Sequence, residues 1–171
     1  MPACPEVAPL SDRITQAFAS RRAVGIDLGS KRIGLAVCDA GGLLATPFET
    51  VDRAGDESVE HGRILAVAAE IDAVALVVGL PIDLAGDEGP AARNVRNEVR
   101  RLTKRVRRAG LAERLTVAVQ DERLTTAEAH RSLDDAGHRG DRRDLIDQLA
   151  AARILQGWLD AGCPGLAASD R

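Results

Sequence analysis

The regular alternation of hydrophobic and polar positions begins near Arg22, and its first part has the short period of β-strands. Residues 23–26 and 33–38 form two apolar runs, separated by a turn at residues 27–30. Two such runs around a tight turn are typical of a β-hairpin. A third run, residues 43–51, follows two glycines. We therefore predict three antiparallel strands in a meander.

The remainder of the chain alternates between helical and extended patterns. Apolar side chains recur about every 3.6 residues, the period of an amphipathic helix, in four segments. These segments are residues 56–71, 90–108, 126–135 and 142–160. Two short apolar runs lie between helices, residues 74–78 ending at Gly79 and residues 115–119 ending before Asp121. Strands that alternate with helices lie parallel in a sheet, so both runs should be parallel to the first strand.

The predicted fold class is therefore α/β, with a mixed five-stranded sheet and helices on both of its faces. The first three strands are antiparallel and the last two are parallel. A chain of 171 residues has the length of one domain. We expect a flexible N-terminal arm at residues 1–21, the folded domain at residues 22–160 and a flexible C-terminal tail at residues 161–171.

Composition argues for a cytoplasmic protein without disulfides or zinc. The first residues lack the basic start and apolar core of a signal peptide, and no apolar run is long enough to cross a membrane. Three cysteines occur at positions 4, 38 and 163, without a CxxC pair. This spacing does not suggest a zinc or redox site.

Charge is unevenly distributed along the chain. The net charge is −3, which excludes a protein that binds polyanions over its whole surface. Residues 91–110 nevertheless contain eight basic residues and one acid, on a helix with an apolar stripe. The candidate phosphate contacts on this helix are Arg93, Arg96, Arg100 and Lys104. The chain has no Tyr, two Phe and one Trp, so recognition of unpaired bases by aromatic stacking is not expected.

Three acids lie where a carboxylate site could form. Asp27 follows the first strand, Glu122 follows the fifth, and Asp147 lies among apolar positions of the last helix. Open α/β sheets place their ligands at the carboxyl ends of strands. Carboxylate oxygens suit Mg²⁺ or Mn²⁺, and such metals support in-line phosphodiester hydrolysis. Taken singly, Asp27 could instead serve a turn, and Glu122 a helix cap.

Four segments together resemble the YqgF/RuvX family. They are GIDLGSKRIGLA at residues 25–36, VGLP at 78–81, DERLTT at 121–126 and IDQLAA at 146–151. The resemblance implies an RNase H-like fold similar to that of the resolvase RuvC, in agreement with the strand order above. It also implies a metal-dependent endonuclease with Asp27, Glu122 and Asp147 as catalytic metal ligands. The substrates implied are the precursor of 16S rRNA, matured at its 5′ end, or branched DNA such as Holliday junctions.

The sequence departs from the wider resolvase pattern at the fourth strand. RuvC-like enzymes carry an acid there, whereas this chain has Gly79, and the next acid is Asp83. Glu122 must then reach farther, or Asp121 or Asp83 could assist. Further candidate phosphate contacts are Lys31, Arg32 and Arg123, and we expect the loop at residues 81–90 to close over the nucleic acid.

One alternative function and one assembly state stay open. A nucleic-acid-binding ribosome-assembly factor without catalytic activity would carry the same acids for structural reasons. Junction cleavage would require a two-fold homodimer, because paired cuts need two related sites.

Overall fold

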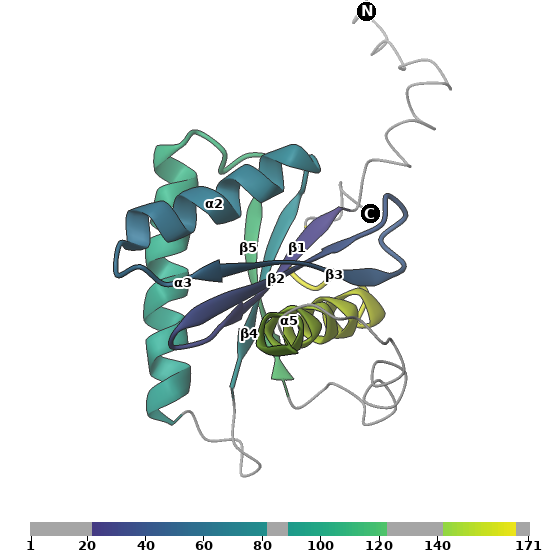
Figure 1. The fold of residues 1–171 in the computed structure, drawn as a ribbon. Helices are drawn as coiled ribbons and strands as arrows, with labels where there is room; N and C mark the ends of the chain where they lie inside the picture. Colours follow the sequence, from purple (N-terminus) through teal and green to yellow (C-terminus); the bar gives the residue numbers. More distant parts are fainter. Residues whose placement is uncertain (1–21, 82–88, 123–141, 167–171) are drawn as a thin grey trace, which may run out of the picture.

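The computed structural model describes residues 22–81, 89–122 and 142–166 (Figure 1). Its five strands are β1 (Ala23–Leu28), β2 (Arg32–Cys38), β3 (Ala45–Asp52), β4 (Ala75–Leu80) and β5 (Thr116–Asp121). They form one sheet in the order β3-β2-β1-β4-β5. β1–β2 and β2–β3 pair antiparallel, while β4 pairs parallel with both β1 and β5. The predicted mixed α/β sheet is thereby confirmed.

In the described part of the chain, three helices cover the two faces of this sheet. α2 (Glu57–Glu70) and α3 (Pro90–Arg108) lie on one face, and α5 (Arg142–Asp160) lies on the other (Figure 1). Alternate residues of β1 divide between the two layers. Val24 and Ile26 belong to the core with α2 and α3, whereas Ala23 belongs to the core with α5. This alternation places Asp27 on the α5 side of the sheet.

Two glycines allow α5 to approach the sheet closely. A Cβ at Gly25 would lie 2.5 Å from the carbonyl oxygen of Ala151, and a Cβ at Gly34 would overlap the carbonyl group of Asp147. Gly34 is also the β2 partner of Asp27 in the strand register. The absence of side chains at these positions therefore brings the backbone of Asp147 next to the end of β1.

The helices largely follow the predicted apolar stripes, with differences in detail. On α3, Val95, Leu102 and Val106 are buried as expected. Asp56 is the N-cap of α2, not a first-turn residue, and its carboxylate accepts a hydrogen bond from the backbone N–H of Ser58. Val59, which the apolar pattern placed on the buried face of α2, is exposed, and its neighbours Glu60 and His61 are buried in its place.

The C-terminal layer extends beyond α5. Trp158 is fully buried, and its indole N–H donates to the carbonyl of Pro164 at 2.9 Å. Cys163 and Leu166, which we assigned to the C-terminal tail, are buried in the same layer. The predicted N-terminal arm and the predicted helix at residues 126–135 lie outside the described residues.

A buried ion-pair cluster joins α2, α3 and the end of β3. The Arg53 guanidinium donates from Nη2 to both carboxylate oxygens of Glu98, at 3.0 and 2.9 Å, and from Nη1 to Glu60 at 3.2 Å. His61 Nε2 lies 3.6 Å from Glu98 Oε1. Burial alone would raise the pKa of Glu98, but His61 and Arg53 outweigh burial and lower it.

Replacing Glu98 with Gln is expected to destabilise the fold by about 3 kcal/mol at pH 7, because Arg53 loses its main counter-charge in a buried setting. A carboxylate whose pKa is lowered on folding contributes stability above its unfolded pKa, about 4.3, and loses it as pH falls through the folded pKa. Urea denaturation should therefore show the wild type and Glu98→Gln converging below about pH 4. Glu70→Gln, which removes an exposed ion pair with Arg63, is the control and should cost less than about 1 kcal/mol. Equal losses in both variants would contradict this interpretation.

The helices in the described part of the chain include none with the length and apolar character needed to cross a membrane.

Candidate active site

The candidate site lies at the edge of the sheet where β1, β4 and β5 end. These three strands are parallel, so their carboxyl ends share this edge. Asp27 near the end of β1 and Glu122 directly after β5 line one pocket of about 170 Å³. The α5 side of the pocket is formed by Ala150, Arg153 and Ile154. Two of the three predicted acids therefore share one cavity.

Gly79 explains how Glu122 reaches this pocket from the outer strand. β4 continues through Gly79, which we expected to end the strand, and Gly79 pairs with Gln120 on β5. A Cβ at Gly79 would lie 2.6 Å from Glu122 Oε1 and would overlap the side chain of Ile154. The Glu122 carboxylate thus occupies space next to β4 that a side chain at position 79 would fill.

Replacing Gly79 with Ala is expected to displace the Glu122 carboxylate. The added methyl group meets Glu122 and Ile154 in a filled space, so we expect a loss of about 1–3 kcal/mol in stability. With Glu122 as the catalytic carboxylate expected from sequence, cleavage activity should fall by about 10²-fold even at temperatures where the variant stays folded, because small misplacements of catalytic groups have this effect. Circular dichroism and a cleavage assay on the same preparation measure both quantities. Wild-type activity in a folded Gly79→Ala protein would show that the position of Glu122 is not important.

Asp147 lies near the other acids but is engaged by a cation. Its Oδ2 accepts a hydrogen bond from Arg32 Nε at 2.6 Å, and Asp144 Oδ1 lies 3.7 Å from the same nitrogen. Arg32 begins β2, directly after the turn that follows Asp27. Arg32, which we considered as a phosphate contact, therefore holds the Asp147 carboxylate in this structure.

Negative charge accumulates in the pocket. Burial raises the pKa of Asp27, and the nearby Asp147 raises it further. Burial also raises the pKa of Glu122, followed by the charges of Asp27 and Asp121, while Arg153 opposes the shift. Carboxylates that are buried and repel one another favour a bound cation or a proton.

The carboxylates of the pocket partly fit the divalent cation expected from sequence. Asp27 and Glu122 supply hard carboxylate oxygens to one pocket, which suits Mg²⁺ or Mn²⁺. Within the described ranges, however, no three carboxylate, imidazole or thiol side chains are close enough together to form a complete metal site. The three-carboxylate convergence expected from sequence is therefore only partly formed. Asp27 and Glu122 line the pocket, and Asp147 does not line it and pairs with Arg32.

The other residues predicted for the site lie in four places. Lys31 is exposed in the turn beside Asp27. Arg93, Arg96, Arg100 and Lys104 lie on α3, on the face of the sheet opposite α5. Arg123, Asp83 and most of the loop at residues 81–90 lie outside the described residues. Asp121 ends β5 and is half-buried.

Sequence reasoning missed two contributors to the pocket. Arg153 lines it from α5, one residue before the buried Ile154. Arg153 follows Asp147 by six residues along the helix. Residues at that spacing do not lie on the same helix face, so the sequence did not indicate that Arg153 lies near the site. The role of Gly79 was visible only as the missing acid of the resolvase pattern.

Comparison with known proteins assigns residues 21–161 to a family model described as RuvX, Holliday junction resolvase. A relative from Mycobacterium sp. (strain KMS) is 44% identical over 148 residues, covering 86% of this chain and 84% of the relative. A relative from Mycobacterium bovis (strain BCG / Pasteur 1173P2) is 46% identical over 141 residues, covering 81% and 78%. Both carry the name "Putative pre-16S rRNA nuclease".

The solved structures that resemble this fold include RuvC from Thermus thermophilus. One structure of that protein in complex with a Holliday junction substrate matches with a TM-score of 0.54 at 19% identity, covering 83% of this chain and 96% of RuvC. A second RuvC structure matches with a TM-score of 0.55 at 18% identity, covering 83% and 97%. At this level of identity the match shows the shared fold, which is RNase H-like.

Proposed function

Since the chain belongs to the RuvX family of Holliday junction resolvases, we propose that it is a divalent-metal-dependent endonuclease that hydrolyses phosphodiester bonds in structured nucleic acid in the cytoplasm. The observation that carries the proposal is the shared pocket of Asp27 and Glu122 at the carboxyl edge of the sheet. Half-buried carboxylates that repel one another at this edge are suited to a cation and a phosphate, which favours a catalytic role over a structural one.

Asp27 and Glu122 would hold the cation, with Asp147 as the third carboxylate. A divalent cation bound there would lower the pKa of a water molecule and would neutralise charge on the scissile phosphate. Arg32 keeps Asp147 beside Asp27 through a 2.6 Å hydrogen bond, so it pre-orients this carboxylate. Arg153, at the wall of the same pocket, supplies positive charge near the position of the phosphate. Lys31, which is exposed at this edge, is a proposed contact to a flanking phosphate, whereas Arg32, considered for the same role from sequence, is engaged by Asp147.

The proposed physiological substrate is the precursor of 16S rRNA, cut during maturation of its 5′ end. Support comes from relatives that share 44–46% identity and are named for this activity. Branched DNA is the second candidate, favoured by the description of the family. Both are folded polyanions, which suits a chain whose few aromatic residues give no platform for stacked bases.

A cleavage assay of both substrates with the same protein preparation distinguishes the two candidate substrates. Labelled 16S rRNA precursor and a labelled four-way DNA junction are incubated with reduced protein and Mg²⁺ or Mn²⁺. We expect cleavage of the RNA at its 5′ extension, with the junction cut slowly or not at all. Preferred cutting of the junction would assign the protein to recombination. Binding of either substrate without cleavage under both metals would favour a ribosome-assembly factor.

The oligomeric state of the protein also distinguishes the RNA substrate from the DNA junction. A junction resolvase needs two active sites related by two-fold symmetry, whereas a single cut in RNA needs one. Sedimentation of the reduced protein is expected to give a monomer at micromolar concentration if the RNA is the substrate. A stable homodimer would instead support junction cleavage.

A further inference from the structure

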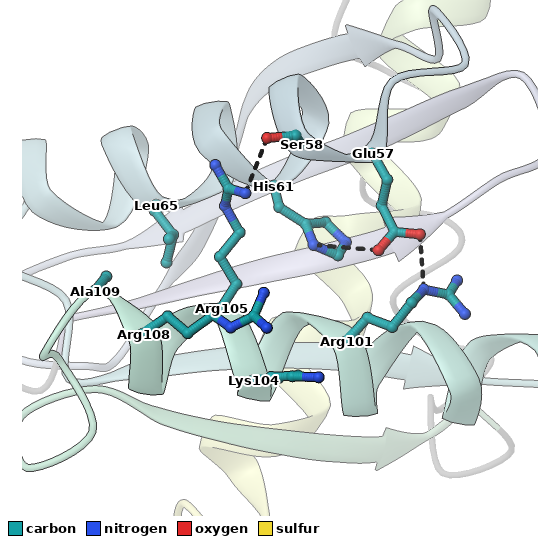
Figure 2. A pocket seen from close by; sticks show the side chains of 9 residues that line it. All are labelled: Glu57, Ser58, His61, Leu65, Arg101, Lys104, Arg105, Arg108 and Ala109. Atoms are coloured by element: carbon teal, nitrogen blue, oxygen red, sulfur yellow. Dashed lines mark hydrogen bonds and ion pairs between the residues drawn. The ribbon is translucent and has the colours of Figure 1, made fainter.

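A second, basic concavity lies between α2 and α3 (Figure 2). It has a volume of about 540 Å³. We call it the α2/α3 groove, and its lining comprises Glu57, Ser58, His61, Leu65, Arg101, Lys104, Arg105, Arg108 and Ala109. Both helices pack on the core layer of Ile26 and Leu76, whereas α5 and Asp27 belong to the other face. The groove is therefore separated from the acidic pocket by the sheet.

Positive charge in the groove exceeds the negative charge that could neutralise it. Of the four cationic side chains, Arg101 forms an ion pair with Glu57 at 2.7 Å. Arg105 donates from Nη1 to the Ser58 hydroxyl at 2.9 Å, so it is oriented by a neutral partner (Figure 2). Neither Lys104 nor Arg108 has an ion pair with a residue that the structure describes, and both side chains are exposed. The groove therefore offers uncompensated cations to an anionic ligand.

The spacing of these cations suits a chain of phosphates better than a single small anion. Positions 101, 104, 105 and 108 follow one face of α3 through two turns. At a rise of 1.5 Å per residue they extend over about 10 Å. Measured along the axis of a double helix, this length corresponds to roughly three base-pair steps at about 3.4 Å each.

The other lining residues also favour a phosphate backbone over bases. His61 is the only ring at the groove, and just 3% of its side chain is exposed because it packs into the ion-pair cluster with Glu98. No aromatic surface is therefore offered for stacking within this groove. The Ser58 hydroxyl and the arginine N–H groups are donors that can contact phosphate oxygens.

We propose that the α2/α3 groove is a second binding site for the phosphate backbone of the nucleic-acid substrate, on the face of the sheet opposite the acidic pocket. The identification of the polyanion as substrate rests on the proposed function. A substrate that occupies both sites must extend around an edge of the sheet, which a long RNA precursor can do. The groove would hold a segment of the substrate distant from the cut and would contribute affinity, not chemistry.

The test is binding of a fluorescently labelled fragment of the 16S rRNA precursor, measured by anisotropy in EDTA so that no cleavage occurs. The double variant Lys104→Glu/Arg108→Glu reverses the two cations without ion pairs. Its matched control is Arg107→Glu/Arg114→Glu, which reverses two exposed arginines outside the groove. We expect the groove variant to bind at least about 10-fold more weakly at 0.1 M salt. The slope of log affinity against log salt should also fall by about 1.4–1.8, as for two lost phosphate contacts.

The control variant should bind within about twofold of the wild type. Equal weakening in both variants would overturn the proposal, because it would reflect net charge alone. Wild-type affinity in the groove variant would also overturn it, and would leave the groove to another anionic partner such as an acidic protein. The binding assay contains no metal, so it tests the groove independently of cleavage. If the groove variant binds RNA more weakly but the wild type never cleaves RNA, the proposed nuclease function is refuted and the groove remains a binding site.

Discussion

Asp27→Asn is expected to lower the cleavage rate by about 10³-fold or more while raising the stability of the metal-free protein. The loss of rate follows because this carboxylate lines the reacting pocket and is a proposed metal ligand. Removal of one group that acts directly on the reacting centre typically costs 10²–10³-fold, and loss of a metal ligand adds to that cost.

The gain in stability follows from the raised pKa of Asp27. Burial and the charge of Asp147 make ionisation of this carboxyl group unfavourable in the folded state. An acid whose pKa is raised on folding contributes stability that is present below its unfolded pKa, about 3.9, and is lost as pH rises through its folded pKa. Asn carries no charge, so the variant should be more stable near pH 7, by a difference on the order of 1 kcal/mol. The two proteins should have equal stability at acidic pH.

Thermal denaturation across pH and a cleavage assay measure these two effects. Asp52→Asn is a matched control, because Asp52 ends β3 at the same edge, is exposed and lies outside the pocket. Asp52→Asn should change the stability by no more than about 0.5 kcal/mol and the cleavage rate by no more than about twofold. A slow and destabilised Asp27→Asn protein would show that Asp27 has a structural role in a turn.

Gly34→Ala is expected to cost about 3 kcal/mol of stability and most of the activity. A Cβ at this position overlaps the carbonyl group of Asp147, so α5 must move away from the sheet. Overpacking of a filled interior costs about 1–3 kcal/mol, and here the obstacle is backbone that cannot rotate aside. The displacement would carry Asp147 away from Asp27, the β1 partner of Gly34.

Urea denaturation of the metal-free protein measures this loss. Gly62→Ala is the control, and it is expected to raise the stability instead of lowering it. Gly62 lies within α2, and the nearest atom to an added Cβ is Arg105 Nη2 at 3.9 Å, so the methyl group has space. Helix propensity predicts that Gly62→Ala stabilises the protein by about 0.5–1 kcal/mol. Wild-type stability in Gly34→Ala would mean that α5 does not depend on this close approach.

The sheet could be predicted from the sequence because its signals are local. Apolar runs bounded by turn residues gave β2 to within one residue, and the change of period gave α3 and α5. The predicted first strand was two residues too short, because Asp27 and Leu28, which we assigned to the turn, continue β1 and pair with β2. Asp27 and Glu122 were found because strand ends in a parallel sheet meet at one edge. The family resemblance strengthened these assignments and was confirmed by the match over residues 21–161.

Contacts between distant segments could not be predicted in the same way. Arg32 and Asp147 are 115 residues apart, and nothing in either local pattern indicates that they form a hydrogen bond. The burial of Glu98 among the arginines of α3 was equally hidden, because its counter-charge is Arg53 at the end of β3. Partners of this kind depend on how elements pack, and periodicity does not encode that packing.

The central claim is that Asp27 and Glu122 together carry metal-dependent phosphodiester hydrolysis. Its most direct test is the single-turnover cleavage rate of labelled 16S rRNA precursor as Mn²⁺ is titrated, for the wild type, Asp27→Asn and Glu122→Gln. We expect a rate that rises with Mn²⁺ in the wild type and is reduced about 10³-fold in both folded variants at every Mn²⁺ concentration. A rate that is independent of Mn²⁺, or that survives in either variant, would contradict it.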